Sequence, residues 1–211
     1  MTPTRRRGRP PTDLVAQGER RSEIIATARQ LFTQSGYAAV SLGQIADEVG
    51  VTKSALYNHF PSKEALYAEV VCSLMASIAE AIRRVADAPL STAERLREIA
   101  GHALVRIPVR SRIDEMMRDV AEHLSPEERA LVTTAHGEML DAMTAVMQRG
   151  VDAGELRADL PADFLATSFL MLVSGYQGHH QGHPPMRGDA WEPEQLPDRV
   201  VSLFLEGAGR R

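Results

Sequence analysis

Apolar side chains recur at intervals of three and four residues along most of the chain, which is the spacing of one face of an α-helix. The longest stripe places Leu66, Val70, Leu74, Ile78 and Ile82 at every fourth position. The sequence contains no Asn-Gly or Asp-Gly hairpin turn and no long alternating run, which are the usual signs of β-strands. The pattern therefore predicts an all-α protein.

Capping residues and helix-stopping residues divide this pattern into separate helices. Ser41, Ser91 and Ser125 each precede a Gln or Glu at the third helical position, which is the arrangement of a capping box. Gly50 can end one short helix, and Pro61 forbids continuation of the next. After a first helix that ends at residue 36, the expected helices span 41–50, 52–60, 62–86, 91–108, 111–123, 125–152, 161–176 and 193–205. The Gly-, Pro- and His-rich stretch between the last two is expected to be a loop.

Residues 41–60, SLGQIADEVGVTKSALYNHF, predict two short helices joined by a tight turn. Ala46 falls on the inner face of the first helix, where a small side chain lets the second helix cross closely. Gly50 can adopt the positive φ that the turn requires. The apolar residues expected to fill the contact between the helices are Ile45, Val49, Val51 and Leu56. This pattern predicts a helix-turn-helix, whose second helix can enter the major groove of DNA.

The outward face of that second helix is polar and carries no acidic residue. Its side chains can reach base edges or phosphates, and they belong to Lys53, Ser54, Tyr57, Asn58 and His59. The two acids of the first helix fall near its C-terminal end, away from the N-terminus where a phosphate would bind. A helical hairpin with a merely solvated polar face is the alternative, but the acid-free helix favours DNA binding.

Charge is distributed unevenly along the 211 residues. The chain has a formal net charge of −4, yet residues 1–63 carry nine Lys and Arg against five Asp and Glu. A cationic head on an anionic body suggests that the head meets a polyanion and the rest does not. The head opens with RRRGRPP at residues 5–11, for which a solvated, unstructured arm is the alternative interpretation.

The stretch SEIIATARQLFTQSGYAAVSLGQIADEVGVTKSALYNHFPSKEALYAEVV resembles the DNA-binding domain of the tetracycline-repressor (TetR) family of transcriptional regulators. The pieces that carry the resemblance are Ala28-x2-Leu31-Phe32, Gly36-Tyr37, Ile45-Ala46, Gly50-Val51, Leu56-Tyr57, His59-Phe60 and Ser62-Lys63-Glu64-Ala65-Leu66. Together they span about a quarter of the chain. Residues 154–176 show a weaker likeness to the segment that leads into the family's dimerisation helices.

The resemblance implies a role for each matching residue. The implied contacts are phosphate binding by Ser41, Thr52 and Lys63, base reading by Lys53, Ser54 and Ala55, and phosphate or groove-wall contact by Tyr57 and His59, with Asn58 on the same face. Gly43 departs from the family pattern, because some members carry a long basic side chain there, which weakens the case for base reading from the first helix of the motif. Tyr37 is expected to pack the three helices together.

Within the basic arm, Arg7-Gly8-Arg9-Pro10 resembles the core of an AT-hook, a short extended peptide that lies in the minor groove. A narrow A·T-rich minor groove concentrates negative potential and attracts arginine. Gly8 lets the backbone approach the groove floor, and Pro10 keeps the chain extended. We therefore expect Arg5, Arg7 and Arg9 to contact DNA.

The remainder of the chain predicts an acidic helical bundle. Its last two predicted helices are apolar around most of their circumference, so each must be covered on both sides. A two-fold four-helix interface covers them, and burial inside a monomer is the alternative. The residues expected at the dimer interface are Phe164, Leu165, Met171, Leu172, Val201, Phe204 and Leu205.

The resemblance also implies a small-molecule site in this bundle. A methionine stripe suits an adaptable apolar site, although such stripes are more often plain core. The residues that we place around a cavity are His102, Arg106, Met116, Met117, His136, Met139, Met143, Phe169 and Tyr176. His179, His180 and His183 lie in the Gly- and Pro-rich segment without a cysteine and with few carboxylates, so we expect a solvated loop, no metal and no cofactor.

These patterns predict an N-terminal three-helix helix-turn-helix domain followed by a helical ligand-binding and dimerisation domain. The expected boundaries are 1–18 for a flexible basic arm, 19–62 for the DNA-binding domain and 63–211 for the remainder. The expected protein is no enzyme but a homodimeric regulator, a repressor that a small, largely apolar ligand releases from a palindromic operator. The alternatives are a ligand-independent architectural DNA-binding protein and an all-helical metal-dependent enzyme.

The single cysteine, Cys72, excludes an internal disulfide framework and fits a reducing cytoplasm. No stretch is expected to reach the ~18 apolar residues that a membrane span needs. We therefore expect a cytoplasmic protein without a membrane segment.

Overall fold

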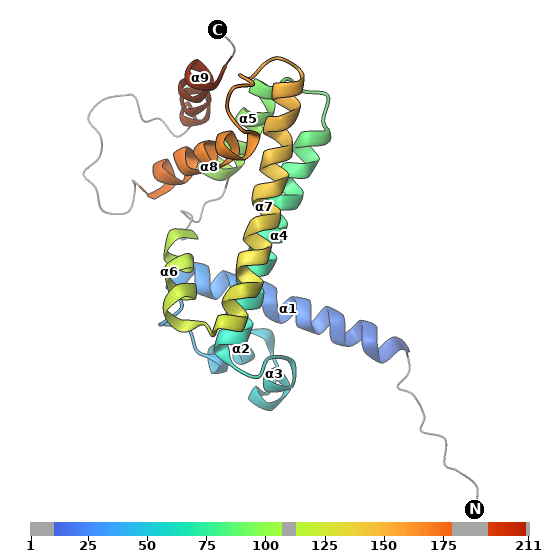
Figure 1. Cartoon of the computed structure of the whole chain (residues 1–211). Coiled ribbons are helices and arrows are strands. Elements are labelled where there is room, and N and C mark those ends of the chain that lie inside the picture. Colours follow the sequence, from blue (N-terminus) through green and yellow to red (C-terminus); the bar gives the residue numbers. More distant parts are fainter. Residues whose placement is uncertain (1–10, 107–112, 179–193, 210–211) are drawn as a thin grey trace, which may run out of the picture. The chain divides into compact units, whose positions relative to one another are not determined.

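The computed structural model of the chain describes residues 11–106, 113–178 and 194–209 (Figure 1). Within these ranges every named element is helical, and the one β-bridge is an isolated antiparallel pair between Leu156 and Gly209. The all-α prediction is therefore confirmed. The chain divides into two compact units, with the boundary between Val70 and Val71 inside one long helix.

The first unit contains three helices and the beginning of a fourth: α1 (Pro11–Ser35), α2 (Leu42–Val49), α3 (Lys53–His59) and the start of α4 (Lys63–Asp87). Its core is a continuous apolar cluster, and the fully buried members include Ile24, Ala28, Phe32, Ile45, Leu56, Phe60, Leu66 and Tyr67. The ring of Phe32 meets that of Tyr67 edge-on, with centroids 4.9 Å apart. This geometry is the favourable one for an aromatic pair, and it joins α1 to α4.

Helix α1 begins earlier than the sequence suggests. The flexible arm was expected to reach residue 18, whereas α1 begins at Pro11. A proline is well tolerated at the first helical position, because its missing N–H would have no partner inside the helix there. The residues of the arm that carry the AT-hook resemblance, including Arg5, Arg7 and Arg9, lie outside the described ranges.

The second unit contains the rest of α4 together with α5 (Thr92–Gly101), η1 (His102–Arg106), α6 (Ile113–His123), α7 (Pro126–Asp152), α8 (Ala162–Gly178) and α9 (Leu196–Ala208). The predicted capping boxes at Ser91 and Ser125 are both formed. The predicted helix 91–108 differs, because its second half is a π-helical turn, η1. Such a turn has a wider hydrogen-bond ring than an α-helix and often occurs at functional sites.

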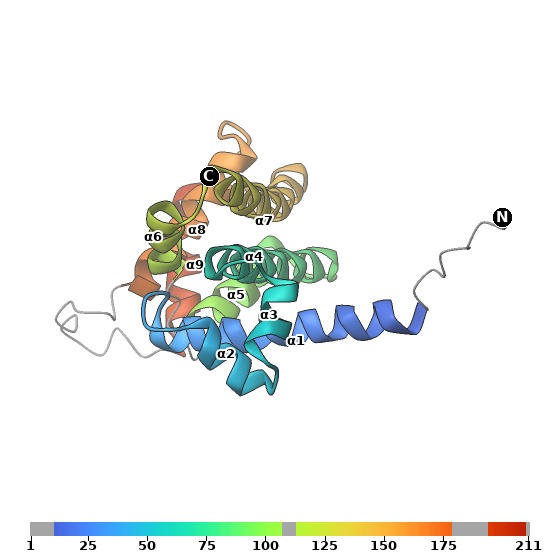
Figure 2. The same ribbon diagram turned by 90° about the horizontal axis from the view of Figure 1, so that it is seen from below.

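Helix pairing in the second unit follows the apolar faces. Helix α7 packs along α8, and α5 packs against both α7 and α9. The two views in Figures 1 and 2 show α4 and α7 running side by side. Arg149 of α7 binds the C-terminal end of α4, donating to the carbonyl of Ala86 and lying 3.0 Å from Asp87 Oδ1. A positive charge at a helix C-terminus is favourable because the unpaired carbonyls there carry partial negative charge.

Helix α4 corrects the expectation that no stretch approaches a membrane span. By length and composition alone it passes that test, with a mean hydropathy of 1.6 over its most apolar 18 residues, of which 44% are buried. Met75, Ala79 and Ile82 are buried within the second unit. Length and composition alone are weak evidence for a span, because a core helix of a soluble protein passes the same test.

Candidate nucleic-acid interface and ligand pocket

The turn between α2 and α3 has the geometry that the sequence predicts. Gly50 adopts a left-handed conformation with φ 74° and ψ 36°, and its N–H donates to the carbonyls of Ala46 and Asp47. The N–H of Val51 also donates to the Ala46 carbonyl, at 2.9 Å. Ala46 itself is fully buried, so any larger side chain there would push the two helices apart. The turn fixes α3 relative to α2, which is what a recognition helix requires.

Both helices of the motif begin at a hydroxyl residue that caps them. Ser41 Oγ accepts from the N–H of Gln44, and Gln44 Oε1 accepts from the N–H of Ser41, which completes a capping box. Thr52 Oγ1 accepts from the N–H of Ala55 at 3.1 Å. Both capping residues are exposed. Because each oxygen accepts from the backbone, the hydroxyl hydrogen is still available to donate to another acceptor.

Helix α3 carries six of the twelve residues predicted to contact DNA, and four of these six lie on its exposed face. Lys53, Ser54, Tyr57 and Asn58 are exposed, and Tyr57 keeps 52% of its surface accessible, which is unusual for a large aromatic side chain. Ala55 and His59 are half-buried at the edge of this face. Leu56 is fully buried and anchors the helix from its opposite side.

Lys63 begins α4 and is held by the aromatic cluster of the first unit. Its Nζ lies 4.1 Å from the centroid of the Tyr37 ring, within the range of a cation–π contact. The Tyr37 hydroxyl donates to Glu64 Oε1 at 2.7 Å, and its ring lies 4.7 Å from that of Tyr67. Tyr37 is therefore a packing residue, as predicted. The hydrogen bond from Tyr37, a backbone hydrogen bond and the charge of Lys63 lower the pKa of Glu64.

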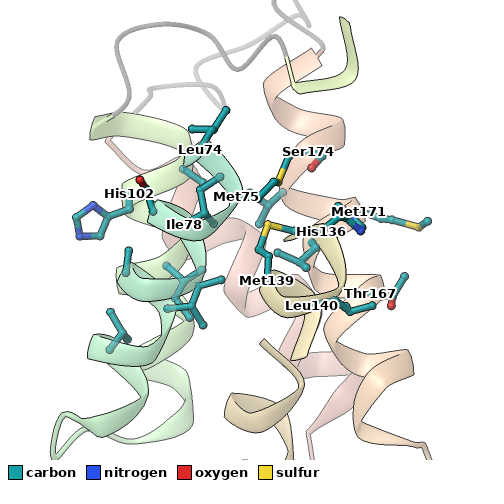
Figure 3. A pocket seen from close by; sticks show the side chains of 18 of the residues that line it. Leu74, Met75, Ile78, His102, His136, Met139, Leu140, Thr167, Met171 and Ser174 are labelled. Carbon is teal, nitrogen blue, oxygen red and sulfur yellow. The ribbon is translucent and has the colours of Figure 1, made fainter. Parts of the chain in front are cut away.

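A cavity of about 480 Å³ lies within the second unit, between α4, α5 and η1 on one side and α7 and α8 on the other (Figure 3). Its wall is almost entirely aliphatic or thioether, and no carboxylate, lysine or arginine is among the described lining residues. Apolar side chains that point inward include Leu74, Met75, Ile78, Ile82, Met139, Leu140 and Leu170. Among the lining residues that the structure describes, the imidazoles are those of His102 and His136, both of which are exposed. Figure 3 shows the ring of His102 turned away from the cavity.

The predicted pocket residues divide into three groups. His102, Met117, His136 and Met139 line the cavity. Three others are buried without lining it, namely Met116, Met143 and Phe169. Phe169 instead packs against Phe204, with ring centroids 5.1 Å apart. The side chains of Arg106 and Tyr176 lie outside the described part of the structure.

The wall contributed by α4 was missed in the sequence. Leu74, Ile78 and Ile82 were recognised as an apolar stripe, but the stripe alone does not tell whether a side chain packs against an atom or faces a space. The π-helical turn η1 adds Ala103 to the wall, and no pattern in the sequence predicts this turn.

Comparison with known proteins decides the family. Residues 24–70, which contain the helix-turn-helix and the first turns of α4, match the family described as "Bacterial regulatory proteins, tetR family". The chain belongs to the TetR family of transcriptional regulators. This TetR-family protein is 28% identical over 193 residues to the HTH-type transcriptional repressor KstR2 of Mycolicibacterium smegmatis, covering 89% of this chain and 90% of the relative.

Solved structures support the same fold. A TetR-family transcriptional regulator from Agrobacterium tumefaciens superposes with a TM-score of 0.69 at 24% identity, covering 92% of this chain and 99% of that chain. The transcriptional regulator FadR of Bacillus subtilis, solved in complex with stearoyl-CoA, superposes with a TM-score of 0.66 at 16% identity and covers 88% of this chain and 98% of that one.

The last two helices of the TetR-family protein expose apolar side chains. Phe164 and Met171, two turns apart on α8, keep 56% and 70% of their surface accessible, and Leu203 of α9 keeps 55%. Leu203 was not among the residues predicted at a dimer interface, whereas Phe164 and Met171 were. The remaining predicted residues are less accessible: Leu172, Phe204 and Leu205 are half-buried, and Leu165 and Val201 are buried in the protomer's own core. Met171 also lines the cavity.

No group of three or more His, Cys, Asp or Glu side chains that could hold a metal ion occurs among the residues that the structure describes. His179, His180 and His183 lie outside those residues.

Proposed function

We propose that this TetR-family regulator is a homodimeric repressor that binds a palindromic operator and leaves it when a small, largely apolar molecule enters the second unit. The observation that carries the DNA-binding part is the exposed, acid-free face of α3, held at a fixed angle by Gly50 and the buried Ala46. The repressor name of the KstR2 relative supports the direction of regulation.

In this proposal the contacts divide into positioning and reading contacts. Ser41 and Thr52 donate their hydroxyl hydrogens to phosphates at the start of α2 and α3, and Lys63 supplies a positive charge beside them. Phosphate contacts of this kind set the register of a protein on DNA without carrying sequence information. Reading falls to the first turn of α3, where Lys53, Ser54 and Ala55 can reach base edges. Tyr57, Asn58 and His59 then border the groove wall.

The exposed apolar residues of α8 and α9 support homodimerisation. Phe164, Met171 and Leu203 would each lose an unfavourable contact with water if a second copy covered them. A two-fold dimer presents two copies of α3, and such proteins bind half-sites one turn of DNA apart, ~34 to 36 Å, or a multiple of it. An operator for this protein is therefore expected to be palindromic.

The cavity supports an apolar effector. Its volume of about 480 Å³ falls within the range of about 300 to 1,000 Å³ that is usual for ligand pockets. A buried charge on the ligand would find no partner among the described lining residues, so a charged group belongs at the rim near His102 or His136. The stearoyl-CoA bound by FadR, a protein of the same fold, joins a long apolar chain to a charged head, and only the chain suits an apolar wall of this kind.

Helix α4 offers a physical route between the two events. It begins at Lys63 in the first unit and supplies Leu74, Met75 and Ile78 to the cavity wall in the second. A ligand that changes the packing of α4 therefore acts on a helix whose first turn carries a predicted phosphate contact.

A regulator of bacterial genes works on DNA in the cytoplasm, so we infer that this protein is cytoplasmic. We assign it no catalytic step.

The test is a selection of genomic DNA fragments with the purified protein, followed by footprinting of the enriched fragments. The expected result is a small set of fragments that share a palindrome, protected by a protein dimer. Enrichment without any shared motif would contradict sequence-specific regulation and favour an architectural role.

A further inference from the structure

The side chain of Lys53, the first residue of α3, lies across Gly43 at the start of α2. A Cβ atom placed on Gly43 would lie 2.7 Å from Lys53 Cε and 3.1 Å from Lys53 Nζ. The same Cβ would lie 3.7 Å from Ser41 Oγ, so position 43 lies between the end of the Lys53 side chain and the cap of α2. Lys53 therefore occupies the volume that any other side chain at position 43 would fill.

The backbone does not require glycine at position 43. Among the described residues, positive φ angles occur only at Gly36, Gly50 and Gly154. Gly43 is the second residue of α2, where alanine would stabilise the helix, because glycine loses more conformational freedom on folding. The backbone of Gly43 would accept alanine, but the space that an alanine methyl group would need is occupied by the Lys53 side chain.

We propose that Gly43 is a specificity-determining residue, because its missing side chain lets Lys53 cross from α3 to the surface of α2. This inference rests on the proposed reading role of α3. Lys53 is the only lysine or arginine in residues 41–60. Because position 43 has no side chain, the ammonium group of Lys53 can extend over α2, and this determines which base it can reach. Lysine donates to the O6 and N7 acceptors of guanine in the major groove. Each half-site should therefore contain one guanine whose recognition depends on both residues.

The substitution Gly43→Ala tests this without disturbing the fold. The new methyl group displaces Lys53, which is exposed and can move into solvent at no cost to the core. The α2 helix itself gains a better helix former, so the melting temperature should not fall. A change in DNA recognition by this variant then reports the position of Lys53 and not a loss of structure.

The experiment selects duplexes from a random library with five purified proteins: wild type, Gly43→Ala, Lys53→Ala, the double variant and Gly137→Ala. Gly137 lies in α7, and a Cβ built on it would have open space around it, so Gly137→Ala adds the same methyl group to a helix far along the chain from the motif. Wild type should prefer guanine at one position of each half-site by about 5- to 150-fold, the range for one good side chain–base pair.

The two single substitutions should flatten that same position and leave the other positions unchanged. The double variant should match Lys53→Ala, because removing the lysine leaves nothing for the methyl group to displace. Gly137→Ala should behave as wild type. The inference is overturned if Gly43→Ala keeps the wild-type preference, if the two substitutions affect different positions, or if Lys53→Ala weakens binding to all sequences equally. Failure of the wild-type protein to enrich any motif would instead contradict the proposed function itself.

Discussion

The hydroxyl of Tyr37 donates a 2.7 Å hydrogen bond to the carboxylate of Glu64, and the ammonium group of Lys63 lies over the ring of the same tyrosine, 4.1 Å from its centroid. One side chain from the loop between α1 and α2 thus holds two consecutive residues of the first turn of α4. The loop is joined to the turn that bears a predicted phosphate contact, so packing in the first unit positions a charge for DNA.

This hydrogen bond makes stability depend on pH in a defined direction. The pKa of Glu64 is lowered in the folded state from an ordinary value of 4.5. The carboxylate therefore contributes stability that is full above 4.5 and is lost as the pH falls through the folded pKa. Tyr37→Phe should lower the free energy of unfolding by about 0.5 to 1.5 kcal/mol at neutral pH.

Urea denaturation at neutral pH and at a pH near 3 measures this effect. The difference between wild type and Tyr37→Phe should shrink in acid, because protonated Glu64 no longer favours the tyrosine as a donor. Glu64→Gln, as the matched control, should show a weaker acid dependence than wild type. A Tyr37→Phe difference that is equal at both pH values would show that the lost hydrogen bond is not coupled to the charge of Glu64.

Two glycines of α7 should respond to alanine in opposite ways. A Cβ on Gly150 would lie 2.8 Å from Thr92 Oγ1 and 2.9 Å from Leu156 Cδ1, so α5 packs directly on this residue. Gly150→Ala should destabilise the protein by about 1 to 3 kcal/mol through overpacking. Gly137→Ala, with open space around it, should be neutral or stabilising by up to about 1 kcal/mol. Thermal denaturation compares them, and a Gly150→Ala protein as stable as wild type would refute the close packing.

The dimer prediction has an internal control. Phe164 is itself 56% exposed in the protomer, so Phe164→Glu should not unfold the chain but should prevent a second copy from covering α8. Leu131→Glu changes a similarly exposed residue of α7 outside the predicted interface, at 58% exposure. Sedimentation equilibrium should find a monomer for the first variant and a dimer for the second and for wild type. A dimeric Phe164→Glu protein would place the interface elsewhere.

The basic arm should be visible in the salt dependence of DNA binding. Each phosphate neutralised contributes a slope of about −0.9 in log K against log salt. Deleting residues 1–10 removes four arginines and should flatten the slope by up to about 3.6. It should also reduce any preference for A·T pairs beside the half-sites. Replacing the same four arginines by lysine keeps the charge and should keep the slope. An unchanged slope after the deletion would mean that the arm remains solvated.

The helix-turn-helix could be predicted from the sequence because its signals are local. Ser41, Gly50 and Thr52 each act on the backbone within a few residues, and the structure forms all three caps. The cavity could be predicted only in part. Met139 lines it and Met143 does not, although both belong to one stripe, because the side of a helix that faces a space depends on neighbours distant in the sequence. For the same reason Met171 could be recognised as apolar but not as a residue of the cavity wall.

The cavity can be closed without touching the predicted DNA contacts. Ala81 lines it from α4, and Ala81→Phe should fill part of the space. The variant should bind the operator as wild type does but should no longer gain thermal stability from apolar compounds. Loss of operator binding with a normal melting temperature would instead show that the cavity residues act on DNA binding even without a ligand.

The most direct test of the account is a reciprocal titration with the operator found by selection. A panel of apolar compounds and of amphiphiles with a long apolar chain, stearoyl-CoA among the latter, is first screened for a rise in melting temperature, and the best compound is added to the preformed protein–DNA complex. If ligand and DNA favour different states of the dimer, each must weaken the other by the same factor, typically about 5- to 150-fold. Ala81→Phe should show no such effect. If a compound that saturates the cavity leaves DNA affinity unchanged, and DNA leaves the affinity for the compound unchanged, this protein is not a ligand-released repressor.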